Sequence, residues 1–137
     1  MAEGDKFRIL ERVPNDEREM DLAVLRHLKA AGADLSLPTH TIFYFYFPTE
    51  QGARAASQEL EKEEYRTDVH PAPAPWWKRL FGRREWSCVA DRITLLEQQA
   101  VFERTARFRA LAARIGGKYD GFEAAVTKSS NDPPAGR

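Results

Sequence analysis

One stretch of sequence decides the fold: Thr41-Ile-Phe-Tyr-Phe-Tyr-Phe-Pro-Thr49. Side chains alternate between the two faces of a strand, so Ile42, Tyr44 and Tyr46 share one face and the three phenylalanines share the other. Neither face is polar, which predicts a central strand rather than a half-buried edge strand. Proline has no N–H for a strand ladder, so Pro48 ends the strand, and Thr49 can cap a following helix.

The tyrosine face of this strand allows two interpretations. Tyr44 and Tyr46 can lie under a covering element, which is the ordinary arrangement, or on an open sheet face. On an open face they would be available to bind a partner. The sequence leaves both interpretations open.

Apolar residues at three-and-four spacing predict three helices. The first runs over residues 15–31 and ends at Gly32. Its apolar stripe is formed by Met20, Ala23, Val24, His27, Leu28 and Ala31, and is widened by Leu22 and Leu25. A shorter helix follows Thr49 and buries Ala53, Ala56 and Leu60. The third runs from about Leu95 to Ile115. Its broad apolar face includes Phe102, Ala106, Arg109, Leu111 and Ala113, with Val101, Phe108, Ala112 and Ile115 nearby. Gly116 and Gly117 then predict a left-handed helix cap.

Three further strands complete the pattern. Alternation predicts strands over residues 65–70 and 85–91, and a short last strand over 122–126, with Tyr119-Asp-Gly121 as the turn before it. After the first helix the order is therefore strand, helix, strand, strand, helix, strand. Right-handed crossovers then give an α+β ferredoxin-like sandwich, in which an antiparallel sheet carries both helices on one face, preceded by an extra N-terminal helix.

Length and composition limit the classes of protein to which the chain can belong. The chain has 137 residues, enough for one domain, to which we assign residues 15–127. We expect residues 1–14 to be a flexible segment and residues 128–137 a disordered tail. Lysine and arginine (21) balance aspartate and glutamate (21), so no overall field attracts nucleic acid or an anionic membrane. The acidic start and the lack of a long apolar run lead us to expect a cytoplasmic protein without a membrane span.

Motifs of catalysis and metal binding are missing from the sequence. It contains no Gly-x-Ser-x-Gly elbow, phosphate-binding loop, Cys-x-x-Cys pair or His-x-x-x-His pair. The single cysteine, Cys88, excludes an internal disulfide framework and lies in an apolar strand, where a structural thiol is usual. Asp120 belongs to a tripeptide that is more typical of a turn than of an acid or base. We expect no catalytic residue, cofactor or metal.

The best site candidate is a basic and aromatic segment after three prolines. Its candidate partner-binding residues are Trp76, Trp77, Lys78, Arg79, Phe81, Arg83 and Arg84, together with Tyr44 and Tyr46 on the central strand. Aromatic rings interleaved with cations can stack on unpaired bases, sit at a membrane surface or anchor a protein interface. The alternative is that the rings fold back on the sheet and the cations only solubilise a long connection.

Several of these pieces together resemble a known family. They are Asp21-Leu-Ala-Val-Leu-Arg-His-Leu, Ala31-Gly-Ala-Asp-Leu, Ile42-Phe-Tyr-Phe-Tyr-Phe-Pro and Ala113-Arg-Ile-Gly-Gly-Lys-Tyr-Asp-Gly-Phe-Glu-Ala. The sequence is similar to the regulator of ribonuclease activity B (RraB) family, inhibitors of ribonuclease E, over about residues 16–126. The resemblance implies a ferredoxin-like domain without a catalytic centre, which docks on the endoribonuclease.

The chain departs from that family in its charge. The best-known members are strongly acidic, whereas this chain is neutral and residues 75–84 are basic and aromatic. The sequence thus predicts a non-catalytic, protein-binding regulator of ribonuclease E or of a related RNA-processing endoribonuclease. The alternative is a single-stranded RNA-binding module that uses the aromatic sheet face and the basic connection.

Overall fold

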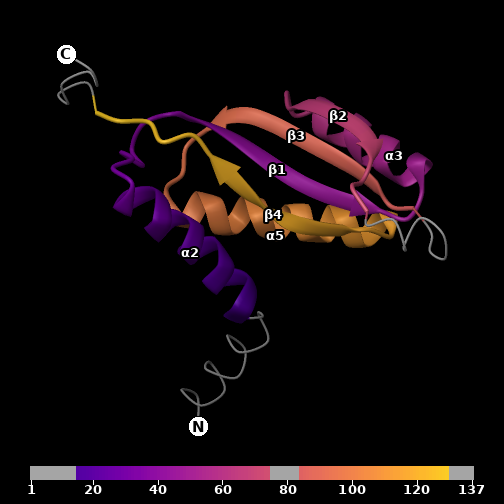
Figure 1. The fold of residues 1–137 in the computed structure, drawn as a ribbon, viewed down its shortest axis with the longest axis horizontal. Coiled ribbons are helices and arrows are strands. Elements are labelled where there is room, and N and C mark those ends of the chain that lie inside the picture. The colour runs from indigo at the N-terminus through magenta and orange to yellow at the C-terminus, as the bar shows by residue number, and fades with distance from the viewer. Residues whose placement is uncertain (1–14, 75–83, 130–137) are drawn as a thin grey trace, which may run out of the picture.

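The computed structural model describes residues 15–74 and 84–129, which form three helices and four strands (Figure 1). In chain order these are α2 (Asn15–Ala30), β1 (Thr39–Phe47), α3 (Glu50–Glu61), β2 (Arg66–Pro71), β3 (Trp86–Thr94), α5 (Gln98–Ile115) and β4 (Lys118–Ala124). The predicted order of elements is confirmed.

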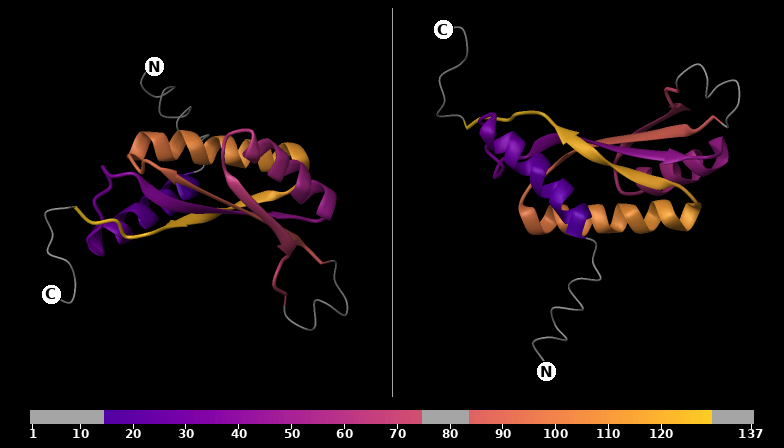
Figure 2. Two further views of the ribbon diagram at one scale, coloured as in Figure 1. Left: turned by 90° about the horizontal axis from the view of Figure 1, so that it is seen from above. Right: turned by 60° about the horizontal axis from the view of Figure 1, so that its bottom comes forward.

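The four strands form one antiparallel sheet in the order β2-β3-β1-β4. β1 pairs with β3 on one side and β4 on the other, so its prediction as a central strand is confirmed. α3 packs on β1, β2 and β3, and α5 packs on β4 and α3, in one helical layer beneath the sheet (Figures 1 and 2). The predicted ferredoxin-like sandwich with an extra N-terminal helix is therefore confirmed.

The core lies between this helical layer and the phenylalanine face of β1. Phe43, Phe45 and Phe47 are buried, and Phe108 of α5 meets the first two edge-on, with ring centroids 4.9 and 5.2 Å away. Edge-to-face contact is favourable because the positive edge of one ring meets the negative face of another. α3 contributes the predicted buried side chains, Ala53, Ala56 and Leu60.

The helix ends are formed as the sequence predicts. The Thr49 hydroxyl accepts a hydrogen bond from the Gly52 N–H at 3.0 Å, which caps α3. Gly116 has a φ of 97° and its N–H donates to the Ala112 carbonyl oxygen at 2.9 Å, which caps α5. Gly32, with the same φ of 97°, follows the end of α2.

The predicted buried stripe of α2 is confirmed at Leu25 and Leu28 and wrong elsewhere. Met20 is 55% exposed, and Ala23, His27 and Ala31 are exposed too. The buried residues are Leu25, Leu28 and the acidic Asp21. α2 turns this side to α5 and β4, where a threonine and an arginine of α5 bind the carboxylate of Asp21. An apolar pattern cannot anticipate a buried carboxylate.

The apolar face of α5 is confirmed at Val101, Phe108 and Ala112 and differs from the prediction elsewhere. The helix begins at Gln98 rather than Leu95, and its buried row is Val101, Thr105, Phe108 and Ala112. Ala106 and Ala113 are exposed, and Phe102, Arg109 and Leu111 flank the buried row. Alanines on both sides of this helix blur its apolar stripe, and burial of Thr105 depends on its hydrogen bond to Asp21.

The turn predicted at Tyr119-Asp-Gly121 is wrong, because these residues belong to β4. Phe43 pairs with Phe122, whereas Phe45 pairs with Tyr119, so β4 carries one extra residue in a β-bulge. Gly121 has a φ of 109°, which suits the bulge. Glycine with a positive φ is common to turns and bulges, so the local sequence could not separate them.

β3 is slightly longer than predicted, and β2 is shifted by one residue along the chain. β3 continues to Thr94, whose hydroxyl lies 2.9 Å from that of Thr41. β2 includes Pro71, which an edge strand tolerates, and the Ala72 N–H then donates to the Glu85 carbonyl oxygen at 2.9 Å. The segments predicted to be flexible or disordered, residues 1–14 and most of 128–137, lie outside the described residues.

Candidate functional site

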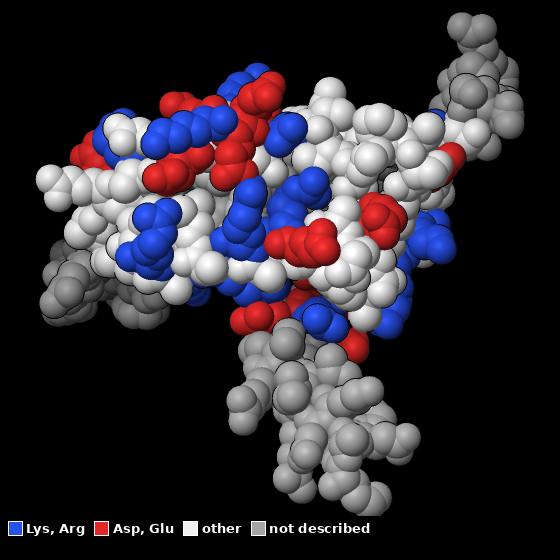
Figure 3. All heavy atoms as spheres, turned by 180° about the vertical axis from the view of Figure 1, so that it is seen from behind, with Lys and Arg blue, Asp and Glu red and all other residues white. Residues whose placement is uncertain are grey.

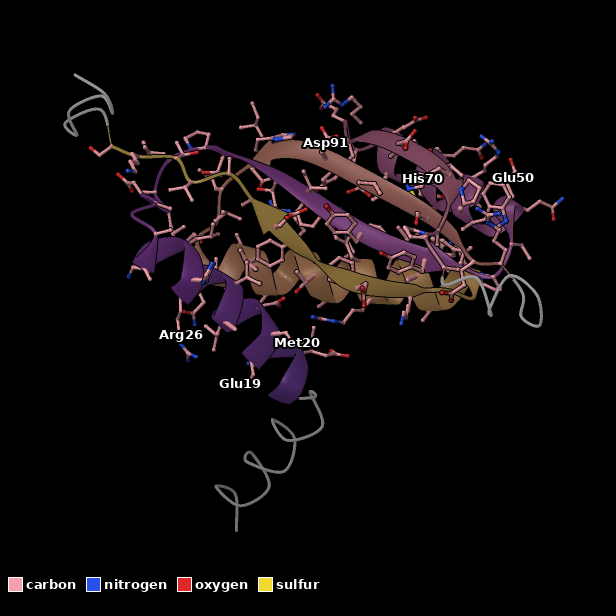
Figure 4. The ribbon with its side chains drawn as sticks, viewed as in Figure 1. Glu19, Met20, Arg26, Glu50, His70 and Asp91 are labelled. Carbon is pink, nitrogen blue, oxygen red and sulfur yellow. The ribbon has the colours of Figure 1, made fainter. Side chains whose placement is uncertain are left out.

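The side of the sheet opposite α3 and α5 is the candidate functional surface, which we call the open face. β1 contributes Ile42, Tyr44 and Tyr46, each of which is half-buried. Residues directly opposite in an antiparallel pair share a face. The neighbouring side chains are therefore Ser87, Val89 and Asp91 on β3, Arg66, Asp68 and His70 on β2, and Lys118 and Glu123 on β4. Figure 4 shows His70 and Asp91 on this same side of the sheet.

The two tyrosines present neutral hydroxyl groups on this face. The Tyr44 hydroxyl donates a hydrogen bond to the Glu123 carboxylate, and this bond, with burial and the Glu123 charge, raises the pKa of Tyr44 to about 12. Burial, with the charges of Asp120 and Glu85, also raises the pKa of Tyr46. Both side chains reach the surface, which agrees with the second interpretation of the tyrosine face.

The open face also carries two histidine–aspartate pairs. His40 Nε2 lies 3.2 Å from Asp91 Oδ1, and Arg66 Nε lies 3.2 Å from the same oxygen. His70 Nδ1 lies 2.7 Å from Asp68 Oδ2. Burial alone would raise the pKa of Asp91, but the hydrogen bonds and charges of His40 and Arg66 outweigh it and lower that pKa. The contacts of Asp91 with His40 and Arg66 join β3 to β1 and β2, whereas His70 and Asp68 both lie on β2.

The chemistry of this surface suits binding. In the part of the chain that the structure describes, no three histidine, cysteine, aspartate or glutamate side chains gather as metal ligands. Burial, with smaller effects of Glu61 and Asp68, raises the pKa of the Cys88 thiol to about 12, so it is not a thiolate at neutral pH. Tyrosine offers a large rigid ring with a polar tip, which is the combination that protein interfaces favour.

The charges of the open face are mixed. Three carboxylates, of Asp68, Asp91 and Glu123, lie there with two permanent cations, Arg66 and Lys118. A surface that binds a phosphate backbone is predominantly basic, whereas this one is not. Figure 3 shows the molecule from behind, where basic and acidic side chains are also interspersed.

Of the predicted partner-binding residues, the structure places three. Tyr44 and Tyr46 lie on the open face, and Arg84 is exposed just before β3. The others, Trp76, Trp77, Lys78, Arg79, Phe81 and Arg83, lie outside the described residues. The connection that contains them leaves β2 at Pro71 and rejoins β3 at Trp86, next to the cross-strand row that contains Tyr46.

A second polar cluster, which sequence reasoning missed, joins α2 to α5. The Thr105 hydroxyl donates to Asp21 Oδ2 at 2.7 Å, and an Arg109 nitrogen lies 3.5 Å from the other oxygen. Arg109 also pairs with Glu17 at 3.4 Å and lies over the Tyr119 ring. Burial raises the pKa of Asp21, against the lowering effects of Thr105 and Arg109. The sequence held one signal for this cluster, which is an acidic residue, Asp21, close to apolar residues of the same helix, Val24, Leu25 and Leu28.

Together the fold and the open face define a class: an α+β sandwich of ferredoxin-like topology that presents a half-exposed tyrosine surface. A comparison with protein-family models then identifies the family, because the model described as Regulator of ribonuclease activity B matches residues 18–124. This is most of the chain, so the chain belongs to that family. A search of curated proteins gave no match.

Family membership fixes the general role. The members are regulators of ribonuclease activity and not enzymes, so this protein is a non-catalytic regulator that binds a ribonuclease. None of the helices in residues 15–74 and 84–129 is both long and apolar enough to cross a bilayer.

Proposed function

We propose that the protein inhibits or otherwise regulates ribonuclease E, or a related RNA-processing endoribonuclease, in the cytoplasm by binding it directly. The observation that carries this proposal is the family match over residues 18–124, which spans all four strands of the sheet. The resemblance of the sequence to inhibitors of ribonuclease E supports the choice of that enzyme.

The open face is the docking surface that we propose. Tyr44 and Tyr46 are half-exposed rings on a rigid central strand, so a partner can bury them at little cost in conformational entropy. The ion pairs of Asp68 and Asp91 border them and provide a polar rim. On sequence grounds the segment Trp76–Arg84, which lies between β2 and β3 in the chain, adds aromatic and arginine anchors.

A direct binding assay tests this proposal. Purified ribonuclease E is immobilised, binding of the full chain is measured, and cleavage of a fluorescent RNA is followed in parallel. We expect binding and a change in cleavage rate. The double variant Tyr44→Ala/Tyr46→Ala should bind on the order of tenfold more weakly, since aromatic anchors dominate interfaces of this kind.

The matched control is Arg54→Ala/Gln58→Ala on the exposed side of α3, which should bind as the parent does. A triple variant, Trp77→Ala/Arg79→Ala/Arg83→Ala, tests the connecting segment separately. The unfolding midpoint of each variant shows that it is folded. Equal binding by the tyrosine double variant and the control would refute the open face as the docking surface. Binding to RNA alone would favour the single-stranded RNA module instead.

A further inference from the structure

A cleft lies between α2 and the edge strand β4. It has a volume of about 760 Å³. One wall is the side of α2 that carries Glu17, Met20 and Val24, and the other is the run of residues 117–123. Figure 4 shows Met20 on this side of α2, with Glu19 and Arg26 turned away from it. β4 is the last strand of the sheet, so the cleft follows an edge that pairs with β1 alone among the described strands.

The residues that line the cleft carry more negative than positive charges. Its lining contains four carboxylates, of Glu17, Asp21, Asp120 and Glu123, but only two cations, Arg109 and Lys118. Arg109 already pairs with both Glu17 and Asp21. Asp120 and Glu123 are exposed at the β4 wall, which leaves the rim negative although the whole chain is neutral. A negative rim attracts a basic partner and repels a polyanion such as RNA.

The cleft also offers apolar contact. Met20 is 55% exposed at its rim. Methionine adapts its shape to different partners, so it suits a binding surface.

The bulge in β4 decides how a partner can be recognised. A regular edge strand invites another strand to pair with it, but the extra residue near Asp120 and Gly121 interrupts the ladder. Recognition in the cleft must therefore depend on side chains more than on continuous backbone pairing.

We propose that this cleft is a docking groove for a basic segment of a protein partner. Arginine or lysine side chains of that segment pair with the carboxylates of Asp120 and Glu123, and an adjacent apolar side chain covers Met20. The inference goes beyond the proposed function, because it concerns a surface at the β4 edge and does not require the partner to be a ribonuclease. The cleft shares Tyr44, Lys118 and Glu123 with the open face, so the test rests on Met20 and Asp120, which line the cleft alone.

A peptide titration tests the groove. The probe is a short fluorescent peptide in which arginines alternate with leucines, and its counterpart has glutamate at each arginine. The full chain should bind the arginine peptide and not the glutamate peptide, with amide NMR shifts at Met20, Asp120 and Glu123. Asp120→Lys should weaken binding about tenfold or more, since close charge pairs carry much of such affinity. Met20→Ala, at an exposed site, should weaken it several-fold.

The matched control is Glu64→Lys, which makes the same change of charge at an exposed residue outside the cleft. It should leave the affinity unchanged. Equal loss in Asp120→Lys and Glu64→Lys would show a non-specific charge effect and overturn the proposal. NMR shifts confined to Tyr46 and His70 would overturn it in favour of the open face. If the protein self-associates but does not bind the peptide, and Asp120→Lys abolishes the self-association, the proposal is overturned in favour of a second copy of the chain in the cleft.

Discussion

The two faces of β1 differ by little more than hydroxyl groups, yet they have separate roles. Phe43, Phe45 and Phe47 are buried beneath α3 and α5, whereas Tyr44 and Tyr46 alternate with them and are half-exposed. The rings are nearly the same size, so the apolar area that each residue could bury is similar. In β1 the rings that carry a hydroxyl group lie on the side of the strand that meets water. The reason is that a buried hydroxyl group needs a hydrogen-bond partner.

Their contacts differ in the same way. Phe45 lies with its ring centroid 5.2 Å from that of Phe108 and 5.3 Å from that of Tyr119, so it joins β1 to α5 and β4. Tyr44 instead bonds to the surface carboxylate of Glu123. One face of β1 therefore stabilises the fold, and the other is available to a partner at little cost in stability.

The largest expected effect is at Phe45. Phe45→Ala should destabilise the domain by about 3–5 kcal/mol, the usual cost of removing a buried phenylalanine. Tyr46→Ala, one residue away on the other face, should cost less than about 2 kcal/mol because part of its ring is already in water. Urea denaturation of both variants measures the difference. Equal losses would mean that the open face is packed as tightly as the core.

An intermediate effect is expected where α5 meets β1. A Cβ atom at Gly117 would collide with the Phe47 ring and with the Tyr46 carbonyl oxygen, whereas one at Gly116 would meet nothing within 4 Å. Gly117→Ala should therefore cost about 2–3 kcal/mol through overpacking against the phenylalanine face. Gly116→Ala should cost about 1 kcal/mol, since its φ of 97° strains any side chain.

Denaturation curves of the two glycine variants decide this point. A larger loss for Gly116→Ala than for Gly117→Ala would show that backbone conformation, and not the close approach of Gly117 to β1, limits this junction.

The smallest expected effect is at Tyr44 on the open face. Tyr44→Phe removes one surface hydrogen bond and should cost roughly 0.5–1 kcal/mol at neutral pH. The pKa of Tyr44 in the folded protein is raised from its ordinary value of 10.0 to about 12. A raised pKa means that the protonated phenol stabilises the fold fully below pH 10.0 and that this contribution is lost as the pH rises through about 12.

The free energy of unfolding measured from neutral to alkaline pH checks the assignment. The parent protein should lose more stability over that window than Tyr44→Phe does, so the two curves should converge. Curves that stay parallel would show that the Tyr44 hydroxyl does not bond to Glu123 in solution.

The accuracy of the sequence-based predictions also differs between regions. Local signals identified β1, the buried side of α3, the start of α3 and the end of α5, because each depends on residues within a few positions of one another. The buried sides of α2 and α5 were predicted only in part, because Leu25, Leu28 and Phe108 are buried as predicted but Asp21 and Thr105 were missed. They meet through Asp21 and Thr105, which are 84 positions apart, and a polar pair of that kind leaves no periodic pattern.

For the two candidate surfaces, too, the sequence predicted the local features and missed those that depend on contacts between distant segments. From the sequence alone, Tyr44 and Tyr46 were placed on one face of a central strand, but whether that face is open depended on which side α3 and α5 cover. The cleft beside β4 was not foreseen, since it requires α2 to lie against β4 and the bulge to place Asp120 at the rim.

The sequence by itself determined the order of the elements, the central position of the aromatic strand, the helix caps and the likeness to a family of ribonuclease regulators. These follow from local periodicity, from backbone preferences of glycine and from motif composition. Only the tertiary structure decided which helix sides are buried, that the tyrosine face is half-exposed and that an acidic cleft borders it. Those features arise from contacts between distant segments, where a carboxylate is buried only because its partners arrive from another helix.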